Sequence, residues 1–239
     1  MRLSHLAAAV LAAAGTATAA DPPAGFSPIF NGKDLTGWKA KNAAKNQWQA
    51  CAASWDAKDP TKLVGGIDNS PDGSGKVLAA ITGGGSDLYT EAKFGDCLIE
   101  VEFMLPKGSN SGVYVMGEYE VQVLDSFGKP ADKLGMGDLG ALYSAAAPKV
   151  NASKAPGQWQ KFEMGFKAPR FADGKKVSNA RFLSVVLNGV SLHKDVELKG
   201  PTPGGLTGKE AATGPLMFQG DHGPVAFKNI KVTPIEVKD

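Results

Sequence analysis

The sequence predicts an all-β sandwich or jelly roll built from antiparallel strands. Three observations support this prediction: short apolar-polar alternations recur along the chain, long amphipathic helical patterns are absent from it, and its 30 glycines and 15 prolines are spread throughout. Alternation with a period of two places one face of a strand on a core and the other toward solvent. Frequent turns between such strands are typical of sandwiches and jelly rolls.

Seven segments carry this alternation, and each is expected to form a strand. In chain order they cover residues 97–105, 111–117, 119–125, 159–166, 181–189, 215–219 and 225–232. Asn188-Gly189 and Asp173-Gly174 accept positive φ and predict tight hairpin turns, and Gly117-Glu118 is expected to reverse the chain. Residues 41–74 and 198–213 are expected to form long loops, which often carry function at the rim of a sandwich.

The first twenty residues have the layout of a cleavable secretory signal. Arg2 precedes an apolar run from Leu6 to Ala14, and small residues come just before Asp21. Because this run is too short to span a bilayer, we expect a periplasmic or secreted protein without a membrane span. The expected organisation is a signal peptide over residues 1–20 and one domain over residues 21–239.

The charge balance bears on the class of partner. The chain has 26 basic and 24 acidic side chains, and removal of the signal peptide takes away one of the basic ones, Arg2. Such a balance carries no signature of nucleic acid or of an anionic membrane as partner, and it leaves the oligomeric state open. Cys51 and Cys97 are an even pair, so a disulfide is chemically permitted in an oxidising compartment. The interpretation that we favour is that Cys97 is a small core residue of its strand.

One predicted strand has unusual polar positions. In YEVQVLDSFG, residues 119–128, Glu120 and Gln122 project to one face and Val121 to the other. Asp125 is out of phase by one residue, and a β-bulge near residues 123–124 would return it to the polar face. The spacing E-x-Q-x-x-D resembles the E-x-D-x-x-E strand of laminarinase-like retaining glucanases. Retaining hydrolysis needs two carboxyls. The middle polar residue of this pattern is the amide Gln122, so ordinary double displacement is not predicted.

A wider set of motifs extends over residues 26–237. It consists of FNGKDLTGW (30–38), NSGVYVMGEYEVQVLDSFG (110–128), GALY (140–143), APKVNASKAPGQW (147–159), VVLNGV (185–190) and GPLMFQGDHGPVAFKNI (214–230). Together these motifs resemble the bacterial 3-keto-disaccharide hydrolase family, whose fold is a concanavalin A-like, laminarinase-like jelly roll. The resemblance implies an enzyme that acts on a small carbohydrate, a glycoside already oxidised to a ketone at C3, and it implies no cofactor.

The resemblance also implies a reaction route. The C3 ketone acidifies the proton on C2, so a general base can remove it, the aglycone can leave from C1, and water can then add. The proposed assignment makes Glu120 the base, with acid or orienting partners, donors to the sugar or enolate, and an aromatic platform around it. The residues assigned are catalytic Glu120, Asp125 and His222, and substrate-binding Gln122, Tyr143, Tyr114 and Lys228.

Several of these residues also have simpler explanations. The polar strand could be a solvated outer face, the tyrosines could pack in the core, Lys228 could be solvated, and His222 in GDHGP could cap a turn. His193 is expected to be a surface side chain. Trp38 and Trp159 are expected to be packing residues.

No metal site is predicted. The mature chain has two histidines and no Cys/His spacing that would bind zinc. Residues 67–75, IDNSPDGSG, have oxygen ligands but lack the calcium-loop spacing, so bound calcium is a minor alternative to a plain polar loop. Gly83-Gly84-Gly85 is not followed by the Lys-Ser/Thr and helix of a phosphate-binding loop.

Two other classes of function stay open at this stage, because a fold alone does not settle activity. The first is a non-catalytic carbohydrate-binding, lectin-like module, and the second is a surface interaction domain. An enzyme should have a pocket with converging acids and a perturbed carboxyl or imidazole, whereas a lectin should have a shallow aromatic groove with Glu120 exposed.

Overall fold

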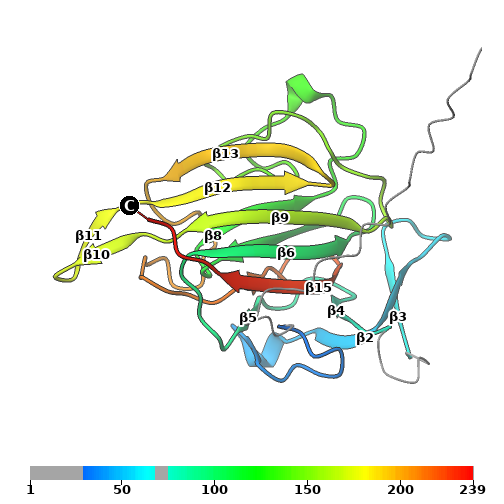
Figure 1. Ribbon diagram of the computed structural model, residues 1–239. Helices are drawn as coiled ribbons and strands as arrows, with labels where there is room; N and C mark the ends of the chain where they lie inside the picture. Colours follow the sequence, from blue (N-terminus) through cyan, green and yellow to red (C-terminus); the bar gives the residue numbers. More distant parts are fainter. Residues whose placement is uncertain (1–28, 68–74, 239) are drawn as a thin grey trace, which may run out of the picture.

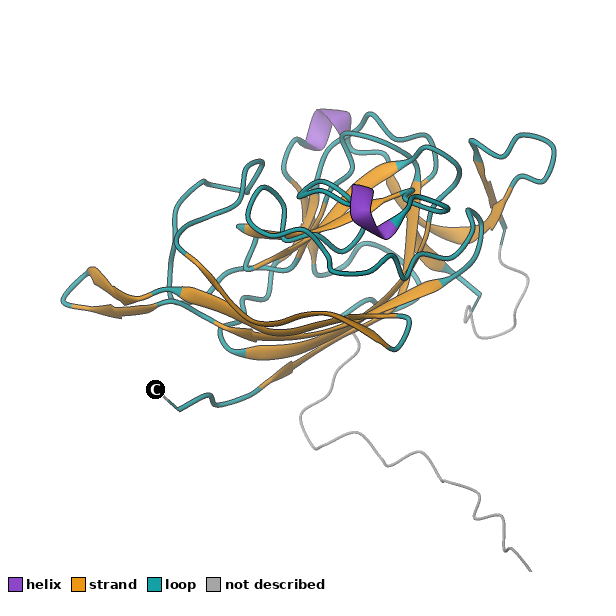
Figure 2. Cartoon of the chain, turned by 90° about the horizontal axis from the view of Figure 1, so that it is seen from above, coloured by secondary structure: helices purple, strands orange, loops and turns teal. Residues whose placement is uncertain are grey.

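Two antiparallel β-sheets make up most of the structure, a computed structural model that describes residues 29–67 and 75–238. Figure 1 shows the larger sheet in front, and Figure 2 shows the two sheets as separate layers. Within the described ranges the only helical elements are the short 3-10 turns η1 (Ala43–Lys45) and η2 (Ala131–Lys133). The all-β jelly-roll prediction is confirmed. The expected signal peptide lies outside the described residues.

The larger sheet has eight strands in the order β13-β12-β9-β6-β15-β4-β2-β3. Their bounds are β13 (Val190–Leu198), β12 (Ala180–Leu187), β9 (Gln160–Lys167), β6 (Cys97–Met104), β15 (Val225–Pro234), β4 (Val77–Ala80), β2 (Trp48–Trp55) and β3 (Leu63–Gly66).

The smaller sheet has five strands in the order β1-β5-β14-β7-β8. Their bounds are β1 (Trp38–Ala40), β5 (Leu88–Thr90), β14 (Met217–Phe218), β7 (Asn110–Val115) and β8 (Tyr119–Leu124). A separate hairpin of β10 (Arg170–Ala172) and β11 (Lys175–Ser178) projects at the left of Figure 1. Strands far apart in sequence are thus neighbours in both sheets, so residues from distant motifs can meet on one face.

The core lies between the two sheets. Phe218 of β14 stacks on Phe227 of β15 with ring centroids 4.0 Å apart, which joins the smaller sheet to the larger one. Trp38 is buried and stacks on Phe218 at 5.4 Å, so its expected packing role is confirmed. Cys97 is fully buried in this core and Cys51 is buried in a separate cluster, and both are free thiols. The favoured interpretation of Cys97 as a core residue is therefore confirmed.

The predicted hairpin turns are confirmed with one change of position. Asn188 and Gly189 have φ values of 53° and 82° between β12 and β13, and the Asp173-Gly174 turn likewise joins β10 and β11 with positive φ at both residues. Between β7 and β8 the positive φ values fall on Met116 and Gly117 rather than on Gly117 and Glu118. The chain therefore reverses one residue earlier than predicted.

The predicted long loop over residues 41–74 is wrong, because β2 and β3 lie within it. In β2 the small residues Ala50, Ala52 and Ala53 separate the two tryptophans, which weakened the apolar alternation that marks a strand. The second predicted loop holds: no strand is assigned from residue 199 to residue 216. No helix among the described residues is long and apolar enough to cross a membrane.

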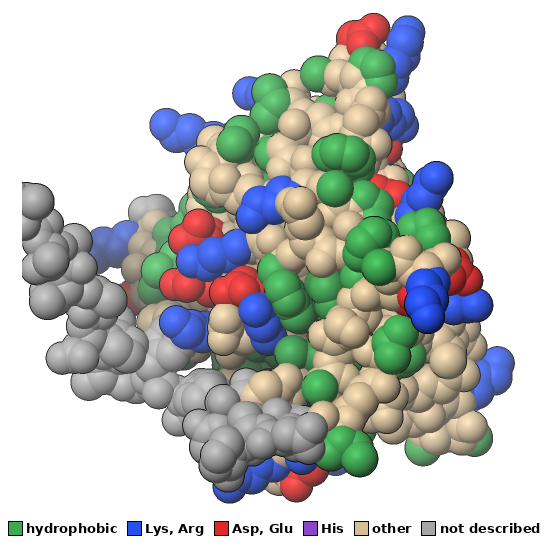
Figure 3. All heavy atoms as spheres, turned by 90° about the vertical axis from the view of Figure 1, so that its right-hand side faces the viewer, with side chains coloured by type: hydrophobic (Ala, Val, Ile, Leu, Met, Phe, Trp, Pro, Cys, Tyr) green, Lys and Arg blue, Asp and Glu red, His purple; other side chains and the backbone are tan. Residues whose placement is uncertain are grey.

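Charged side chains of both signs are intermingled on the molecular face in Figure 3. Lysine and arginine side chains lie close to acidic ones there, rather than in large areas of one sign. The distribution on this face agrees with the near-neutral charge balance of the sequence.

Candidate functional site

Glu120 and Gln122 lie on the outer face of the smaller sheet, as the alternation predicted. The intervening Val121 and the following Val123 are buried in the core between the sheets. β8 pairs with β7 in an unbroken register that sets Tyr114 opposite Glu120 and Gly112 opposite Gln122. Because paired residues in antiparallel strands point to the same face, the Tyr114 and Glu120 side chains are direct neighbours.

A further segment continues this sheet beyond β8. The amide of Gln122 donates to the carbonyl of Ala141 (2.9 Å), and the amide of Tyr143 donates to the carbonyl of Glu120 (3.1 Å). These bonds place the GALY motif alongside β8, with Tyr143 next to Glu120. The carboxyl thus has one tyrosine on the β7 side and another on the opposite side.

The loop over residues 199–216 closes over these side chains. The hydroxyl of Thr202 accepts a hydrogen bond from the amide of Glu120 (2.9 Å), and the Tyr114 hydroxyl donates to the carbonyl of Pro203 (3.2 Å). Gly204 has φ +82°, and a Cβ there would lie 2.6 Å from the Tyr114 hydroxyl oxygen. A glycine is therefore required for this close approach of the loop to the tyrosine.

Together these elements enclose a pocket of about 170 Å³. Five of the seven residues assigned from the sequence line it, together with four that the sequence analysis did not assign. The lining residues are Asn110, Tyr114, Glu120, Gln122, Tyr143, Pro203, Gly204, Gln219 and His222. Glu120 is the one carboxyl in this set.

Three buried oxygen atoms in the pocket lining have no hydrogen-bond partner. They are Asn110 Oδ1, Glu120 Oε1 and Gln219 Oε1, and the one other such side-chain atom among the described residues, Ser178 Oγ, is not in the lining. Buried polar atoms are almost always satisfied, because leaving one without a partner costs about 1–3 kcal/mol. Three unsatisfied oxygens in one pocket therefore mark places where a bound molecule can donate hydrogen bonds.

The Glu120 carboxyl is buried and its pKa is strongly perturbed. It is 2% exposed, and burial raises its pKa from 4.5 to about 8. The neighbouring Tyr114 hydroxyl opposes this shift, whereas the nearby negative charges of Asp87 and Asp221 add to it. A Cβ on Gly112 would lie within 2.9 Å of the carboxyl carbon, so a glycine is needed beneath the carboxylate. The site therefore holds a carboxyl that changes charge near neutral pH.

His222 stands at the opening of the pocket. Its side chain is about half exposed, and its Nδ1 lies 2.5 Å from Asp221 Oδ1. The contact with Asp221 orients the ring through Nδ1 and leaves Nε2 as the ring nitrogen available to another group. His222 is thus brought together with Glu120 in the pocket lining.

Asp125 does not line the pocket, so the structure does not bring it together with the other assigned residues. The register between β7 and β8 has no bulge, and β8 ends at Leu124. The Asp125 carboxylate instead accepts hydrogen bonds from the amides of Gly108 (2.8 Å) and Phe127 (3.2 Å). Because nothing shifts its phase, the residue leaves the strand and stabilises the following turn.

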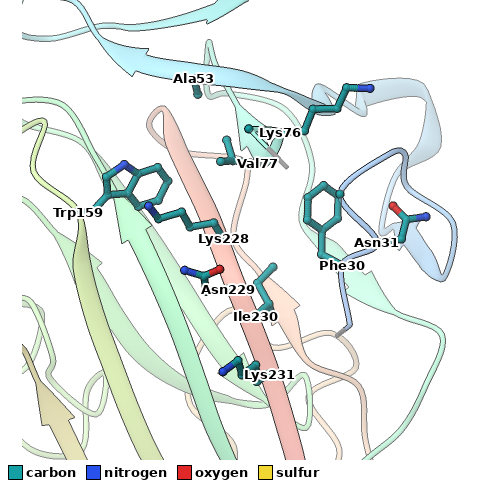
Figure 4. Close-up of a pocket in the computed structure, with 12 residues that line it drawn as sticks. Phe30, Asn31, Ala53, Lys76, Val77, Trp159, Lys228, Asn229, Ile230 and Lys231 are labelled. Carbon is teal, nitrogen blue, oxygen red and sulfur yellow. The ribbon is translucent and has the colours of Figure 1, made fainter. Parts of the chain in front are cut away.

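Lys228 does not line the pocket either. β15 belongs to the larger sheet, and the side chain lies on that sheet's outer face, where Nζ is 4.2 Å from the centre of the Trp159 ring and 3.5 Å from Glu102 Oε2. Figure 4 shows both residues beside a separate hollow of about 410 Å³ that Phe30 also lines. The alternation identified the correct face of the strand but could not identify the sheet.

His193 is buried rather than exposed, so its prediction as a surface residue is also wrong. It is 3% exposed, and its Nε2 lies 2.9 Å from the carbonyl of Gly140. Burial lowers its pKa. A register shift opposite this part of β13 buries Leu192 and His193 together and breaks the simple alternation. The imidazole therefore supports the segment that leads to Tyr143.

Four lining residues were not predicted from the sequence: Asn110, Gln219, Pro203 and Gly204. Asn110 and Gln219 begin or follow short strands, where an amide has no pattern that separates it from a surface residue. The pairing of β14 with β7 brings them to one face, since Phe218 is opposite Val113 and the amide of Gln219 donates to the carbonyl of Gly112 (3.0 Å). Long-range pairing of this kind leaves no local signal in a single sequence.

Among the described residues, no group of three or more His, Cys, Asp or Glu side chains is arranged to hold a metal ion. Most of the segment considered for calcium, residues 68–74, lies outside the described ranges.

Trp159 is partly buried against a small cluster that includes Ala226 and Met104, in agreement with its expected packing role.

Comparisons with known proteins identify the family and the fold. Residues 25–233 match the family described as "3-keto-alpha-glucoside-1,2-lyase-like domain". A curated relative from Bacteroides thetaiotaomicron, named 3-keto-disaccharide hydrolase, is 26% identical over 160 residues, which are 57% of this chain and 51% of the relative. The chain therefore spans about half the length of the curated relative that it matches.

Two solved structures from Parabacteroides distasonis have the same fold. One, described as "a putative glycosyl hydrolase", superimposes with a TM-score of 0.64 and 26% identity, covering 88% of this chain and 84% of the other. The second carries the same description and has a TM-score of 0.59 at 19% identity, covering 88% and 94%. The second likeness concerns the fold alone.

Proposed function

The chain belongs to the 3-keto-alpha-glucoside-1,2-lyase-like family, and from this premise we propose that it cleaves 3-keto-glycosides, 3-keto-disaccharides among them, by elimination followed by hydration. The family and the name of the curated relative support a glycoside hydrolase-type function. The 3-keto substrate and the elimination route are the finer parts of the proposal, and they rest on the chemistry of the pocket.

The proposed reaction has two stages. A base removes the proton on C2, the C2–H electrons form a C1=C2 double bond, and the C1–O bond breaks so that the aglycone leaves as an alcohol after it takes up a proton. Water then adds across the double bond, with hydroxyl to C1 and a proton to C2. The C3 ketone makes the first step accessible, because it delocalises the developing negative charge onto its oxygen.

The observation that carries the proposal is the single buried carboxyl in the lining. Ordinary retaining or inverting hydrolysis uses two carboxyls across the bond, and here the neighbouring position on the strand is Gln122. Elimination needs one base, and burial gives Glu120 a pKa of about 8, close to the pH at which a general base is most effective. The carboxyl also has an unpartnered Oε1 in the pocket.

The remaining lining residues supply donors rather than further negative charge. Burial raises the pKa of Tyr114, so its phenol stays protonated and can donate a hydrogen bond. The Gln122 amide and the Tyr143 phenol are neutral donors next to the carboxyl, and they would stabilise the enolate oxygen or the leaving group. His222, oriented by Asp221, is the group that can pass a proton at the pocket opening.

Substrate comparison tests this proposal. Protein covering residues 21–239, and its Glu120→Gln variant, would be incubated in metal-free buffer with glycosides and with the same glycosides oxidised at C3. We expect turnover of the keto forms alone, reduced by about 10²-fold or more in the variant. Turnover of unoxidised glycosides would contradict the route. Binding without turnover of either set would instead establish the carbohydrate-binding alternative, whose expected exposed Glu120 does not agree with the 2% exposure.

A further inference from the structure

The glycine-rich segment before β5 packs against the segment that carries His222. Gly84 donates its amide to the carbonyl of His222 (2.8 Å), and Gly85 donates to the carbonyl of Gly220 (2.9 Å). A Cβ on Gly83, which has φ +66°, would lie 2.5 Å from the carbonyl oxygen of His222. The glycine run therefore supports one wall of the pocket by close backbone contact rather than by binding phosphate.

Asp87 follows this run and reaches the same wall with its side chain. It is 6% exposed, and its Oδ1 accepts a hydrogen bond from the amide of Gly220 (3.2 Å), two residues before His222. Asp87 lies two residues before Tyr89, which pairs with Met217, and Met217 pairs in turn with Tyr114. This register places the aspartate on the same outer face of the smaller sheet as the pocket, one strand beyond β14.

Lys41 connects this aspartate to the opposite wall. Its Nζ lies 3.4 Å from Asp87 Oδ2 and donates to the carbonyl of Gly205 (3.2 Å). Gly205 adjoins Gly204 in the loop that closes over Tyr114. One ion pair therefore links the loop on one side of the pocket to the His222 segment on the other. Neither side chain lines the pocket, so neither is a candidate for substrate contact.

We propose that Asp87 and Lys41 form a positioning pair for Glu120. The pair holds the two walls of the pocket in place relative to each other, and Asp87 provides a fixed negative charge near the base. The turnover part of this inference rests on the proposed function, whereas the structural part does not. The charge acts together with the other groups around Glu120. Those groups are Tyr114 from β7, Tyr143 beside β8, and Asp221 and His222 after β14.

The electrostatic consequence has a definite sign. Asp87 and Asp221 both disfavour the ionised form of Glu120 and so raise its pKa. Burial raises the pKa of Asp87 itself, while Lys41 opposes that shift. Replacement of Asp87 by a neutral side chain of the same shape should therefore lower the pKa of Glu120.

Two substitutions of Asp87 separate its charge from its hydrogen bond. Asp87→Asn keeps an oxygen that accepts a hydrogen bond from the amide of Gly220 but removes the charge. The pKa of Glu120 should therefore fall by about 0.5 to 1. The carboxyl resonance of ¹³C-labelled Glu120 measures this titration without substrate, and the acid limb of kcat/KM should move in the same direction. Asp87→Ala also removes the acceptor, and kcat should fall about tenfold or more as the His222 segment loosens.

Lys41→Met tests the second wall, with Lys39→Met as the matched control. Lys39 lies two residues earlier, in β1, is exposed and pairs with Glu91 (2.7 Å) away from the pocket. We expect Lys41→Met to raise KM several-fold and Lys39→Met to leave KM and kcat unchanged. If the pKa of Glu120, read from its carboxyl resonance, is the same in Asp87→Asn as in wild type, the charge inference is overturned. This test holds even if the protein turns over no 3-keto-glycoside. Wild-type kinetics in both Asp87→Ala and Lys41→Met would overturn the positioning inference.

Discussion

Replacement of Glu120 by glutamine should make the protein more stable at neutral pH while removing its proposed base. The wild-type carboxyl is 2% exposed and keeps its proton up to a pKa of about 8, against 4.5 for an ordinary glutamate. Glutamine has nearly the same shape and carries no charge at any pH. The variant therefore removes the cost of holding an ionisable group in this pocket without leaving a cavity.

The magnitude follows from linkage between protonation and folding. Between pH 4.5 and 8 the unfolded chain releases the Glu120 proton and the folded protein retains it, so wild-type stability falls as the pH rises. Each unit of pKa shift corresponds to about 1.4 kcal/mol, which gives about 3 kcal/mol at pH 7. The same energy corresponds to roughly 6–12 °C in the unfolding temperature for a domain of this size.

Denaturant and thermal unfolding of wild type and Glu120→Gln from pH 4 to pH 8 measure this effect. We expect nearly equal free energies of unfolding near pH 4 and a gap that favours the variant and widens with pH. A gap that stays constant over this range would show that Glu120 does not remain protonated in the folded protein. A variant less stable than wild type at pH 7 would refute the reasoning outright.

Three further substitutions test the geometry of the site. Gly112→Ala should reduce turnover by about tenfold or more, because the new Cβ displaces the Glu120 carboxyl, whereas Gly66→Ala, with no atom within 4 Å of its new Cβ, should retain wild-type rates. Asp125→Ala should lower the free energy of unfolding by about 1–2 kcal/mol through loss of its backbone hydrogen bonds, with kcat/KM changed less than threefold; a large loss of activity would return Asp125 to the mechanism. Lys228→Ala should leave the kinetic constants unchanged, and a tenfold fall in kcat/KM would contradict its placement on the other sheet.

The local parts of the fold were predictable from the sequence. Period-two alternation identified the strands that pack in the core, and the Asn188-Gly189 pair identified its hairpin because few dipeptides accept positive φ at both positions. The same alternation placed Glu120 and Gln122 together on one face. Strand β2 was missed because its alanines carry little hydrophobic signal.

The site itself depends on pairings that no local pattern encodes. Asn110 and Gln219 reach the pocket because β14 inserts between β5 and β7, about a hundred residues away in sequence. Lys228 lies on the other sheet, which the sequence could not show, since alternation does not tell which sheet a strand joins. Asp125 lies outside the pocket for a different reason: the bulge expected near residues 123–124 is absent from the regular pairing of β8.

The fate of the hydrogen on C2 tests the proposed route most directly. A 3-keto-glycoside deuterated at C2 would be turned over by the wild-type protein, and the deuterium in the released sugar would be measured against a control of the released sugar kept in buffer. Removal of that hydrogen by Glu120 predicts that the product loses its deuterium and that the deuterated substrate reacts more slowly than the ordinary one. Full retention of deuterium, with equal rates for the two substrates, would contradict elimination and with it the role of Glu120 as the base.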